Sequence, residues 1–352
     1  MWFTSDNAAP AHPAVLEALA AANTGFSGSY GADDVSERVV ARIRDIFEAP
    51  EAAVLLVATG TAANAIALAC LCPPWATVYA HKSAHAEVDE CGAPEFYTGG
   101  AKITLLDGAD AKIDPDALEA ALARTGATGV HNVQRGALTL TNSTEAGAVY
   151  SVEEIRTLVG LAKAQGCPVH LDGARFGNAV AALGCTPAEM TWKAGIDAVS
   201  FGGTKNGLMG VEAIILFDPS RAWEAALRRK RGGHLFSKHR FLAAQMDAYL
   251  DGDLWLELAA RANARAARLS QGLLQAPNTH LCHPTEANAV FAAYSRRAHR
   301  AAMEAGAHYY LWPSDQSMDG PDDAVLSARL MCSWTTTEED VDRLIAAVRQ
   351  AA

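Results

Sequence analysis

A single lysine stands at the end of a glycine-rich turn in the middle of the chain. Residues 198–201 are an apolar run that predicts a short strand, and Gly202, Gly203 and Thr204 lead from it to Lys205. Open α/β sheets bind ligands at the carboxyl ends of their strands, so this turn is expected to place the lysine in such a crevice. A lysine that loses its proton in a crowded site is a nucleophile toward carbonyl carbons. Considered alone, Lys205 is better interpreted as a solvated lysine in a loop beside a turn.

An acidic residue ends a second apolar run. Residues 169–171 predict a strand that leads into Asp172 and, three residues later, Arg175. A carboxylate in this place can keep the nitrogen of a pyridine ring protonated, so that the ring accepts electrons. An arginine can bind a carboxylate through two parallel hydrogen bonds. Beside Lys205, these residues favour pyridoxal 5′-phosphate (PLP) as a cofactor over the alternative in which Asp172 caps a helix and pairs with Arg175.

A third turn follows the apolar residues 53–57, where Gly60 and Thr61 begin a predicted helix. Free backbone N–H groups at a helix start, together with a threonine hydroxyl, suit a phosphate monoester. The spacing matches neither the P-loop nor the dinucleotide fingerprint, which argues against a nicotinamide-dependent dehydrogenase. Cys70 and Cys72 are only a weak metal signal without a second pair of ligands, so no metal site is predicted.

The order of these three turns resembles the fold-type I PLP enzymes, and more narrowly the threonine aldolases of the β-eliminating lyase group. The most specific match is residues 170–175, which fit the family pattern H-x-D-G-A-R. The resemblance extends over most of the chain. Further segments that match begin at Ser5, Tyr30, Ala84 and Ala328.

The resemblance implies a role for each matching residue. The catalytic residues would be Lys205, which forms a Schiff base with PLP, Asp172, which pairs with the pyridine nitrogen, and His85, which lies against the ring. The implied cofactor-binding residues are Gly60, Thr61, His85, Asp172, Arg175, Thr204, Lys205 and Lys238. The implied substrate-binding residues are Ser5, Tyr30, Arg175 and Arg329, in which the two arginines clamp the substrate carboxylate.

The implied activity is that of a carbon–carbon lyase. It would cleave the Cα–Cβ bond of L-β-hydroxy-α-amino acids (threonine, allo-threonine, phenylserine) to glycine and an aldehyde. Thr144 departs from the family, which often has a second histidine there to contact the substrate hydroxyl. The threo or erythro preference therefore stays open, and His85 or an ordered water is left as the base. A β-eliminating PLP lyase acting on another amino acid is the main alternative, and a catalytically silent PLP-fold protein is another.

The elements that position these residues alternate between helices and short apolar strands. The predicted strands are residues 53–57, 77–80, 102–106, 169–171, 198–201 and 212–217. An apolar stripe predicts a helix over residues 36–47, and a capping box at Ser151 begins another. Strands separated by helices imply a mostly parallel sheet with helices on both faces.

The pattern changes after residue 218. Helices are predicted over residues 219–231 and 241–274, the second interrupted at 251–253, and shorter strands follow, with a final helix from Thr337. We therefore expect an α/β fold of the fold-type I PLP-transferase class. An N-terminal arm and a large PLP-binding domain would occupy residues 1–245, and a small C-terminal α+β domain residues 246–352.

Composition limits the partners of this chain of 352 residues. Half of the residues are hydrophobic and a fifth are charged, as in ordinary globular proteins. The net charge of −11 argues against nucleic acid or an anionic membrane surface as the main partner. No apolar run is long enough for a membrane span, so a cytoplasmic location is expected. A small amino-acid substrate and a homo-oligomer, tetramer or dimer, are expected from the resemblance.

Overall fold

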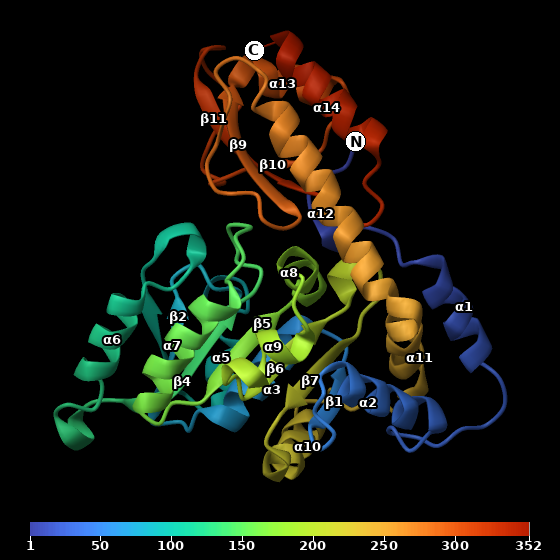
Figure 1. The fold of residues 1–352 in the computed structure, drawn as a ribbon, viewed down its shortest axis with the longest axis vertical. Coiled ribbons are helices and arrows are strands. Elements are labelled where there is room, and N and C mark those ends of the chain that lie inside the picture. Colours follow the sequence, from blue (N-terminus) through green and yellow to red (C-terminus); the bar gives the residue numbers. More distant parts are fainter. Residues whose placement is uncertain (352) are drawn as a thin grey trace.

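The computed structural model describes residues 1–351, and its largest element is a seven-stranded sheet (Figure 1). The strand order is β1-β7-β6-β5-β4-β2-β3. The strands are β1 (Ala53–Val57), β2 (Ala76–His81), β3 (Lys102–Leu106), β4 (Gln134–Thr141), β5 (Val169–Gly173), β6 (Ala198–Gly202) and β7 (Glu212–Leu216). Strands β3, β2, β4, β5 and β6 are parallel, whereas β7 runs antiparallel to β6 and to β1. The mostly parallel sheet predicted from the sequence is thereby confirmed.

Both faces of this sheet are buried, as is usual for parallel strands. Along β7, Ala213 and Ile215 join one apolar cluster, whereas Ile214 and Leu216 join another on the opposite face. One face is covered mainly by α3 (Gly60–Leu71), with α5 and α10 beside it. The other face is covered by helices that include α2, α7 and α8.

The helices of this part of the chain agree with the predicted pattern. They are α1 (Pro13–Ala22), α2 (Asp34–Ile46), α3, α4 (His85–Val88), α5 (Ala93–Thr98), α6 (Pro115–Arg124), α7 (Val152–Ala164), α8 (Phe176–Leu183), α9 (Pro187–Met190), α10 (Ala222–Arg231) and α11 (Arg240–Leu250). Ser151 caps α7 in a reciprocal capping box with Glu154. The predicted interruption at residues 251–253 is a 3₁₀ turn in which Gly252 has φ of 56°.

A second sheet lies beyond the long helix α12 (Leu254–Leu273), which extends toward it from the large sheet (Figure 1). Its order is β10-β11-β9-β8, all antiparallel. These strands are β8 (His280–Leu281), β9 (Ala289–Ser295), β10 (Tyr310–Leu311) and β11 (Val325–Met331), and α13 (Arg296–Glu304) and α14 (Glu338–Ala351) complete the unit.

The N-terminal arm belongs to the same packing unit as the second sheet. The Phe3 amide donates to the His308 carbonyl at 2.8 Å, and the Phe3 side chain lies in the apolar cluster built by α12, α14 and the second sheet. The arm therefore crosses the space between the two sheets, where Ser5 and Asn7 line a cavity. The domain division at residues 245 and 246 stays a prediction. Among residues 1–351 no helix is long and apolar enough to cross a membrane.

Three buried histidines are expected to make stability depend on pH. Burial lowers the pKa of His170, His239 and His299 to about 4. Each is held neutral in the folded protein and protonates near pH 6.5 when unfolded, so stability is full above pH 6.5 and declines as pH falls toward 4. Taken alone, these three histidines are expected to lower the thermal midpoint by on the order of 5–10 °C between about pH 7.5 and pH 5. The buried carboxyls Glu145 and Glu212, whose pKa is raised to about 7, act in the opposite direction over this range, so the histidine effect is obtained by comparing variants.

Differential scanning fluorimetry across this pH range measures the effect. His170 binds Thr139 through Nδ1 and Ser200 through Nε2, each at 2.9 Å, and thereby bridges three neighbouring strands. The variant His170→Gln should be less stable at neutral pH and should show a smaller decline on acidification. The exposed His131 provides the matched control, because His131→Gln should leave the pH dependence unchanged. A decline of equal size in all three proteins would contradict the prediction.

Candidate active site

The carboxyl ends of the parallel strands meet at one edge of the large sheet, where the structure has a cavity of about 610 Å³. Ser83 and His85 follow β2, Glu145 follows β4, and Arg175 and Lys205 follow β5 and β6. The opposite wall comes from the second sheet and the N-terminal arm. It includes Ser5, Ala289, Phe291 and Arg329.

The turn that carries Lys205 is anchored by its neighbours. The Gly203 amide donates to Glu212 Oε2 at 2.9 Å, and Asn206 Nδ2 donates to the Tyr249 hydroxyl and to the Trp255 carbonyl, both at 2.8 Å. Gly207 has φ of 103°, a conformation that favours glycine. The backbone around Lys205 is therefore fixed without any contribution from the lysine side chain.

Asp172 is the centre of a buried polar chain that leads to His85. Asp172 Oδ1 accepts from the Ala174 amide at 2.9 Å, and Oδ2 accepts from Asn64 Nδ2 at 2.8 Å. The same Asn64 nitrogen donates to Glu90 Oε1 at 2.8 Å, and Glu90 Oε1 lies 2.9 Å from His85 Nδ1. These contacts place the Asp172 carboxylate and the His85 imidazole in one network with fixed orientations.

The contact between His85 and Glu90 shifts the pKa of both groups. The hydrogen bond to Glu90 raises the pKa of His85, and burial opposes it. Burial raises the pKa of Glu90, which the hydrogen bond from His85 partly offsets. The Nδ1 side of His85 is therefore paired with a buried carboxyl group, which fixes the orientation of the ring.

Arg175 is held by an acidic residue of the N-terminal arm. Its Nε and Nη2 donate to the two oxygens of Asp6 at 2.7 and 2.9 Å, and Asn288 donates to Asp6 Oδ2 at 3.0 Å. Burial opposes ionisation, but Arg175 lowers the pKa of Asp6 overall, so the pair is ionised. The remaining nitrogen, Nη1, has no protein hydrogen-bond partner among residues 1–351 and is available to a ligand.

Arg329 of β11 provides a second guanidinium in the same cavity. Its Nη2 donates to the Thr4 carbonyl at 3.2 Å, its Cζ lies 5.3 Å from the centre of the Trp312 ring, and its buried Nε has no partner in residues 1–351. Burial and the charge of Arg175 lower its pKa. Two cationic side chains with one carboxylate between them leave a net positive charge, which suits a small carboxylate ligand.

The expected phosphate-binding groups lie at the start of α3 and in the lysine turn. Thr59 caps α3 by accepting the Ala62 amide, which leaves the earlier amides of that helix without a side-chain partner. A Cβ atom built on Gly60 would have no atom within 4 Å, so the space above it is open. The Thr204 hydroxyl is buried near the Glu212 carboxyl group but makes no hydrogen bond of normal geometry in the described part of the chain.

Six predicted site residues do not line this cavity. Gly60, Thr61, Asp172 and Thr204 belong to the helix start, the polar network and the lysine turn described above, whereas the other two lie in other parts of the structure. Tyr30, with φ of 59°, lines a separate pocket with Arg229 and His239, and Lys230 Nζ is 5.0 Å from its ring centre. Lys238 is exposed in the loop before α11. Within one subunit the structure thus brings Ser5, His85, Arg175, Lys205 and Arg329 to one cavity and leaves Tyr30 and Lys238 elsewhere.

Sequence reasoning missed several polar residues of the site. They are Asp6, Asn64, Glu90, Glu145 and Asn288. Asn64 could have been found, because it is a single amide in an otherwise small and apolar stretch of α3. Asp6 could also have been found, because it directly follows Ser5, which was predicted to bind the substrate. Glu90 and Asn288 offered none, since nothing local distinguishes them from surface residues.

The fold and this cavity agree with what comparison with known proteins finds. The model of the beta-eliminating lyase family matches residues 3–296, so the chain belongs to that family. The low specificity L-threonine aldolase of a Pseudomonas species (strain NCIMB 10558) is 39% identical over 348 residues, which cover 99% of this chain and 96% of the relative.

Solved structures show the same relationship. The threonine aldolase of Leishmania major is 27% identical and superposes with a TM-score of 0.90 over 99% of this chain and 98% of its own. The serine palmitoyltransferase of S. paucimobilis, solved with bound PLP, has a TM-score of 0.71 at 17% identity and covers 100% of this chain and 87% of its own. The second likeness concerns the fold alone, and together they confirm the fold-type I architecture predicted from the sequence.

Proposed function

We propose that this chain is a PLP-dependent aldolase that cleaves the Cα–Cβ bond of L-β-hydroxy-α-amino acids to glycine and an aldehyde. It is a carbon–carbon lyase of the threonine aldolase type. The observation that carries the proposal is the cavity in which Lys205, the Asp172 network and a pair of guanidinium groups meet. The relatives named as threonine aldolases support it over nearly the whole chain.

The residues present fit PLP. Lys205 would hold its carbonyl carbon, Asp172 its ring nitrogen, and His85 would lie against the ring. The phosphate would be held by the open start of α3 at Gly60 and Thr61 and by the Thr204 hydroxyl. When bound, PLP provides an electron sink for the electron pair left on Cα after one of its bonds breaks.

The remaining residues select the bond. Arg329 and the unpaired Nη1 of Arg175 bind the substrate carboxylate, with Ser5 beside them in the cavity wall. With the carboxylate fixed there and the amino group fixed at the cofactor, only one direction remains for the β-carbon. The Asp6 carboxylate keeps Arg175 from rotating away, because both of its oxygens are bound to that guanidinium.

The proposal is tested by product analysis with three substrates. PLP-saturated protein is given L-threonine, L-allo-threonine and L-phenylserine, and aldehyde and glycine are quantified. Equal amounts of aldehyde and glycine are expected, and the ratio of rates gives the threo or erythro preference. Ammonia and a keto acid instead of glycine would place the reaction among the β-eliminations. A colourless protein that is inert to all three would contradict the proposal as a whole.

The proposal includes a homo-oligomer and a cytoplasmic location. Tyr30 and Lys238 are outside the cavity of their own subunit, so we assign their predicted substrate and phosphate contacts to the cavity of a second copy. Large exposed apolar side chains such as Trp75, Phe96 and Trp223 provide surface for an interface between copies. Size-exclusion chromatography with light scattering distinguishes a dimer from a tetramer.

A further inference from the structure

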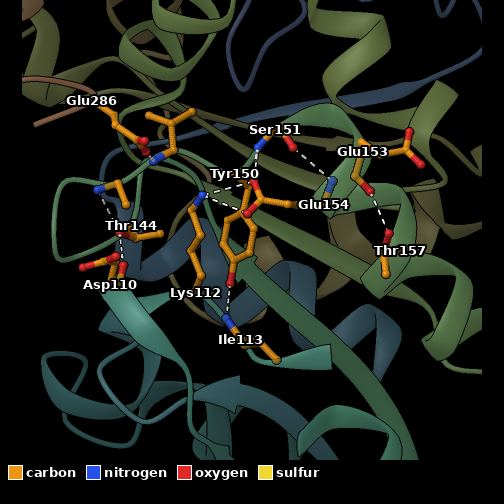
Figure 2. Close-up of polar contacts among 12 residues, drawn as sticks. Asp110, Lys112, Ile113, Thr144, Tyr150, Ser151, Glu153, Glu154, Thr157 and Glu286 are labelled. Atoms are coloured by element: carbon orange, nitrogen blue, oxygen red, sulfur yellow. Dashed lines mark hydrogen bonds and ion pairs between the residues drawn. The ribbon is translucent and has the colours of Figure 1, made fainter. Parts of the chain in front are cut away.

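Two consecutive residues after β4, Thr144 and Glu145, differ in what they can offer a substrate. The Thr144 hydroxyl donates to the Asp110 carbonyl at 2.8 Å and accepts from the Ala148 amide at 3.2 Å (Figure 2). Both contacts hold the loop that leads from β4 to α7. The Thr144 proton is therefore used by the backbone, and the hydroxyl, which is not basic, has at most one lone pair left for a substrate.

Glu145 has unused capacity to accept a hydrogen bond. It lines the cavity, and its Oε1 accepts from the His85 amide at 2.9 Å. Its Oε2 is buried and makes no hydrogen bond of normal geometry among residues 1–351, although the Thr141 hydroxyl lies close enough to influence the pKa of the carboxyl group. A buried carboxyl oxygen without a donor costs stability, so a second role is needed to explain its presence in the wall of a reaction chamber.

The surroundings of Glu145 favour proton exchange at neutral pH. Burial, and then the charge of Asp172, raise its pKa to about 7, and the His85 amide and the Thr141 hydroxyl partly offset this rise. Two further ionisable groups lie near Glu145. Against the effect of burial, Asp6 raises the pKa of Arg175, with a smaller contribution from Glu145, and burial raises the pKa of Tyr150, again with a smaller contribution from Glu145. A proton acceptor is most effective when its pKa lies close to the working pH.

His85 is less suited to the same task. Its Nδ1 is already paired with Glu90, and the hydrogen bond between them raises the pKa of the ring. The His85 ring is also the group proposed to lie against the cofactor. Glu145, in contrast, has a buried oxygen without a hydrogen bond of normal geometry and lies in the cavity wall.

We propose that Glu145 is the catalytic residue that accepts the proton of the substrate β-hydroxyl, a role that rests on the aldolase function proposed above. The O–H bond breaks and its proton passes to the Glu145 carboxylate. The oxygen electron pair forms the carbonyl of the aldehyde as the Cα–Cβ bond breaks. The electron pair of that bond stays on Cα, which takes up one proton to become glycine.

Glycine is a substrate with which proton transfer from the β-hydroxyl can be distinguished from the other steps. It has the carboxylate and amino group that the site binds, but it has no β-hydroxyl. In Glu145→Gln, which keeps the shape of the side chain, we expect kcat for L-phenylserine cleavage to fall by roughly 10²-fold. Exchange of a glycine Cα proton with deuterated water, and the affinity for glycine, should stay within about threefold of the native values.

The pH profile and an infrared measurement test the same residue independently. The native kcat/KM should rise with pH through about 7, because Glu145 must be deprotonated, and this rise should be absent from Glu145→Gln. Glu145→Asp should retain part of the rate and the rise with pH. In the infrared difference spectrum between native and Glu145→Gln protein, recorded without substrate, a carboxyl band should disappear as pH increases through the same range.

Glu286 provides the matched control. Its Oε2 accepts from the Val149 amide at 2.7 Å on the same loop, and it is not part of the cavity wall (Figure 2). Glu286→Gln should keep both reactions and the rise with pH. A parallel loss of cleavage and glycine exchange in Glu145→Gln would overturn the proposal in favour of a structural role. Unchanged cleavage beside an active native enzyme would overturn this proposal alone, whereas no aldehyde from the native protein would overturn it together with the proposed function.

Discussion

The variant Lys205→Ala is expected to lose aldehyde release by at least roughly 10³-fold, because it removes the nucleophile that holds the cofactor. The fold should survive the change. The surrounding turn is anchored through Gly203 and Asn206, and the lysine side chain makes no hydrogen bond or ion pair with the described residues. The loss would therefore report chemistry and not unfolding. Aldehyde release after PLP saturation and covalent fixation of the cofactor by borohydride measure the effect.

Lys112 is a suitable control for this prediction. It precedes α6 and is paired at 3.0 Å with Glu154 in the first turn of α7, and it does not line the cavity (Figure 2). Because exposed ion pairs contribute about 0–1 kcal/mol, Lys112→Ala should keep native-like activity and fixation. Borohydride fixation at native yield in Lys205→Ala would show that another lysine holds the cofactor. That result would remove the basis of the proposed function.

Much of the fold could be predicted, because apolar runs and helix starts are local signals. Strands β1 and β3 have the predicted bounds, and β5, β6 and β7 differ from the prediction by no more than two residues at an end. Strand β4 was not predicted. It contains the polar residues Gln134 and Arg135, and Gly136 is required because a Cβ there would lie 2.4 Å from Cys72 Sγ. Such a strand is defined by its neighbours and has little pattern of its own.

The position of a candidate residue was predictable where it lies at the end of a strand, as with Lys205 and Asp172, whose chemical roles are proposals. It was not predictable where two distant segments meet. Arg175 was expected to bind a substrate carboxylate with two nitrogens, but the pairing with Asp6 occupies Nε and Nη2. This pairing joins residues 169 positions apart and depends on the path of the N-terminal arm between the two sheets. A single sequence contains no local record of such a contact.

The protonation of the acid–base groups also depends on contacts between separate segments. The family resemblance offered His85 as a base, yet its pKa depends on Glu90, which approaches from the turn after α4. Glu145 had no sequence signal at all, and its raised pKa arises from burial and from Asp172 on the neighbouring strand. Residue type predicts which groups can titrate, whereas their pKa values depend on the packed structure.

The Asp172→Asn variant should reduce kcat/KM for aldehyde release by roughly 10³-fold, because a neutral amide no longer stabilises a protonated ring nitrogen. Binding of the cofactor through Lys205 should persist, so borohydride fixation would remain. The local structure should tolerate the change with a small loss. In native protein Asp172 accepts two N–H groups, from Asn64 and from Ala174. An asparagine can accept only one of them, and its own N–H₂ group then faces the other donor.

Asp197 provides the control for Asp172, because it lies at the opposite edge of the same sheet. It precedes β6, and its Oδ2 accepts from the Val169 amide at the start of β5, so it borders the same two strands as Asp172 at their opposite ends. Asp197→Asn should reduce the thermal midpoint without changing kcat/KM, since the ion pair with Lys163 is lost far from the cavity. Equal losses of activity in the two variants would mean that sheet stability limits the rate. A selective loss in Asp172→Asn, with fixation retained, would separate electronic support of the cofactor from its attachment.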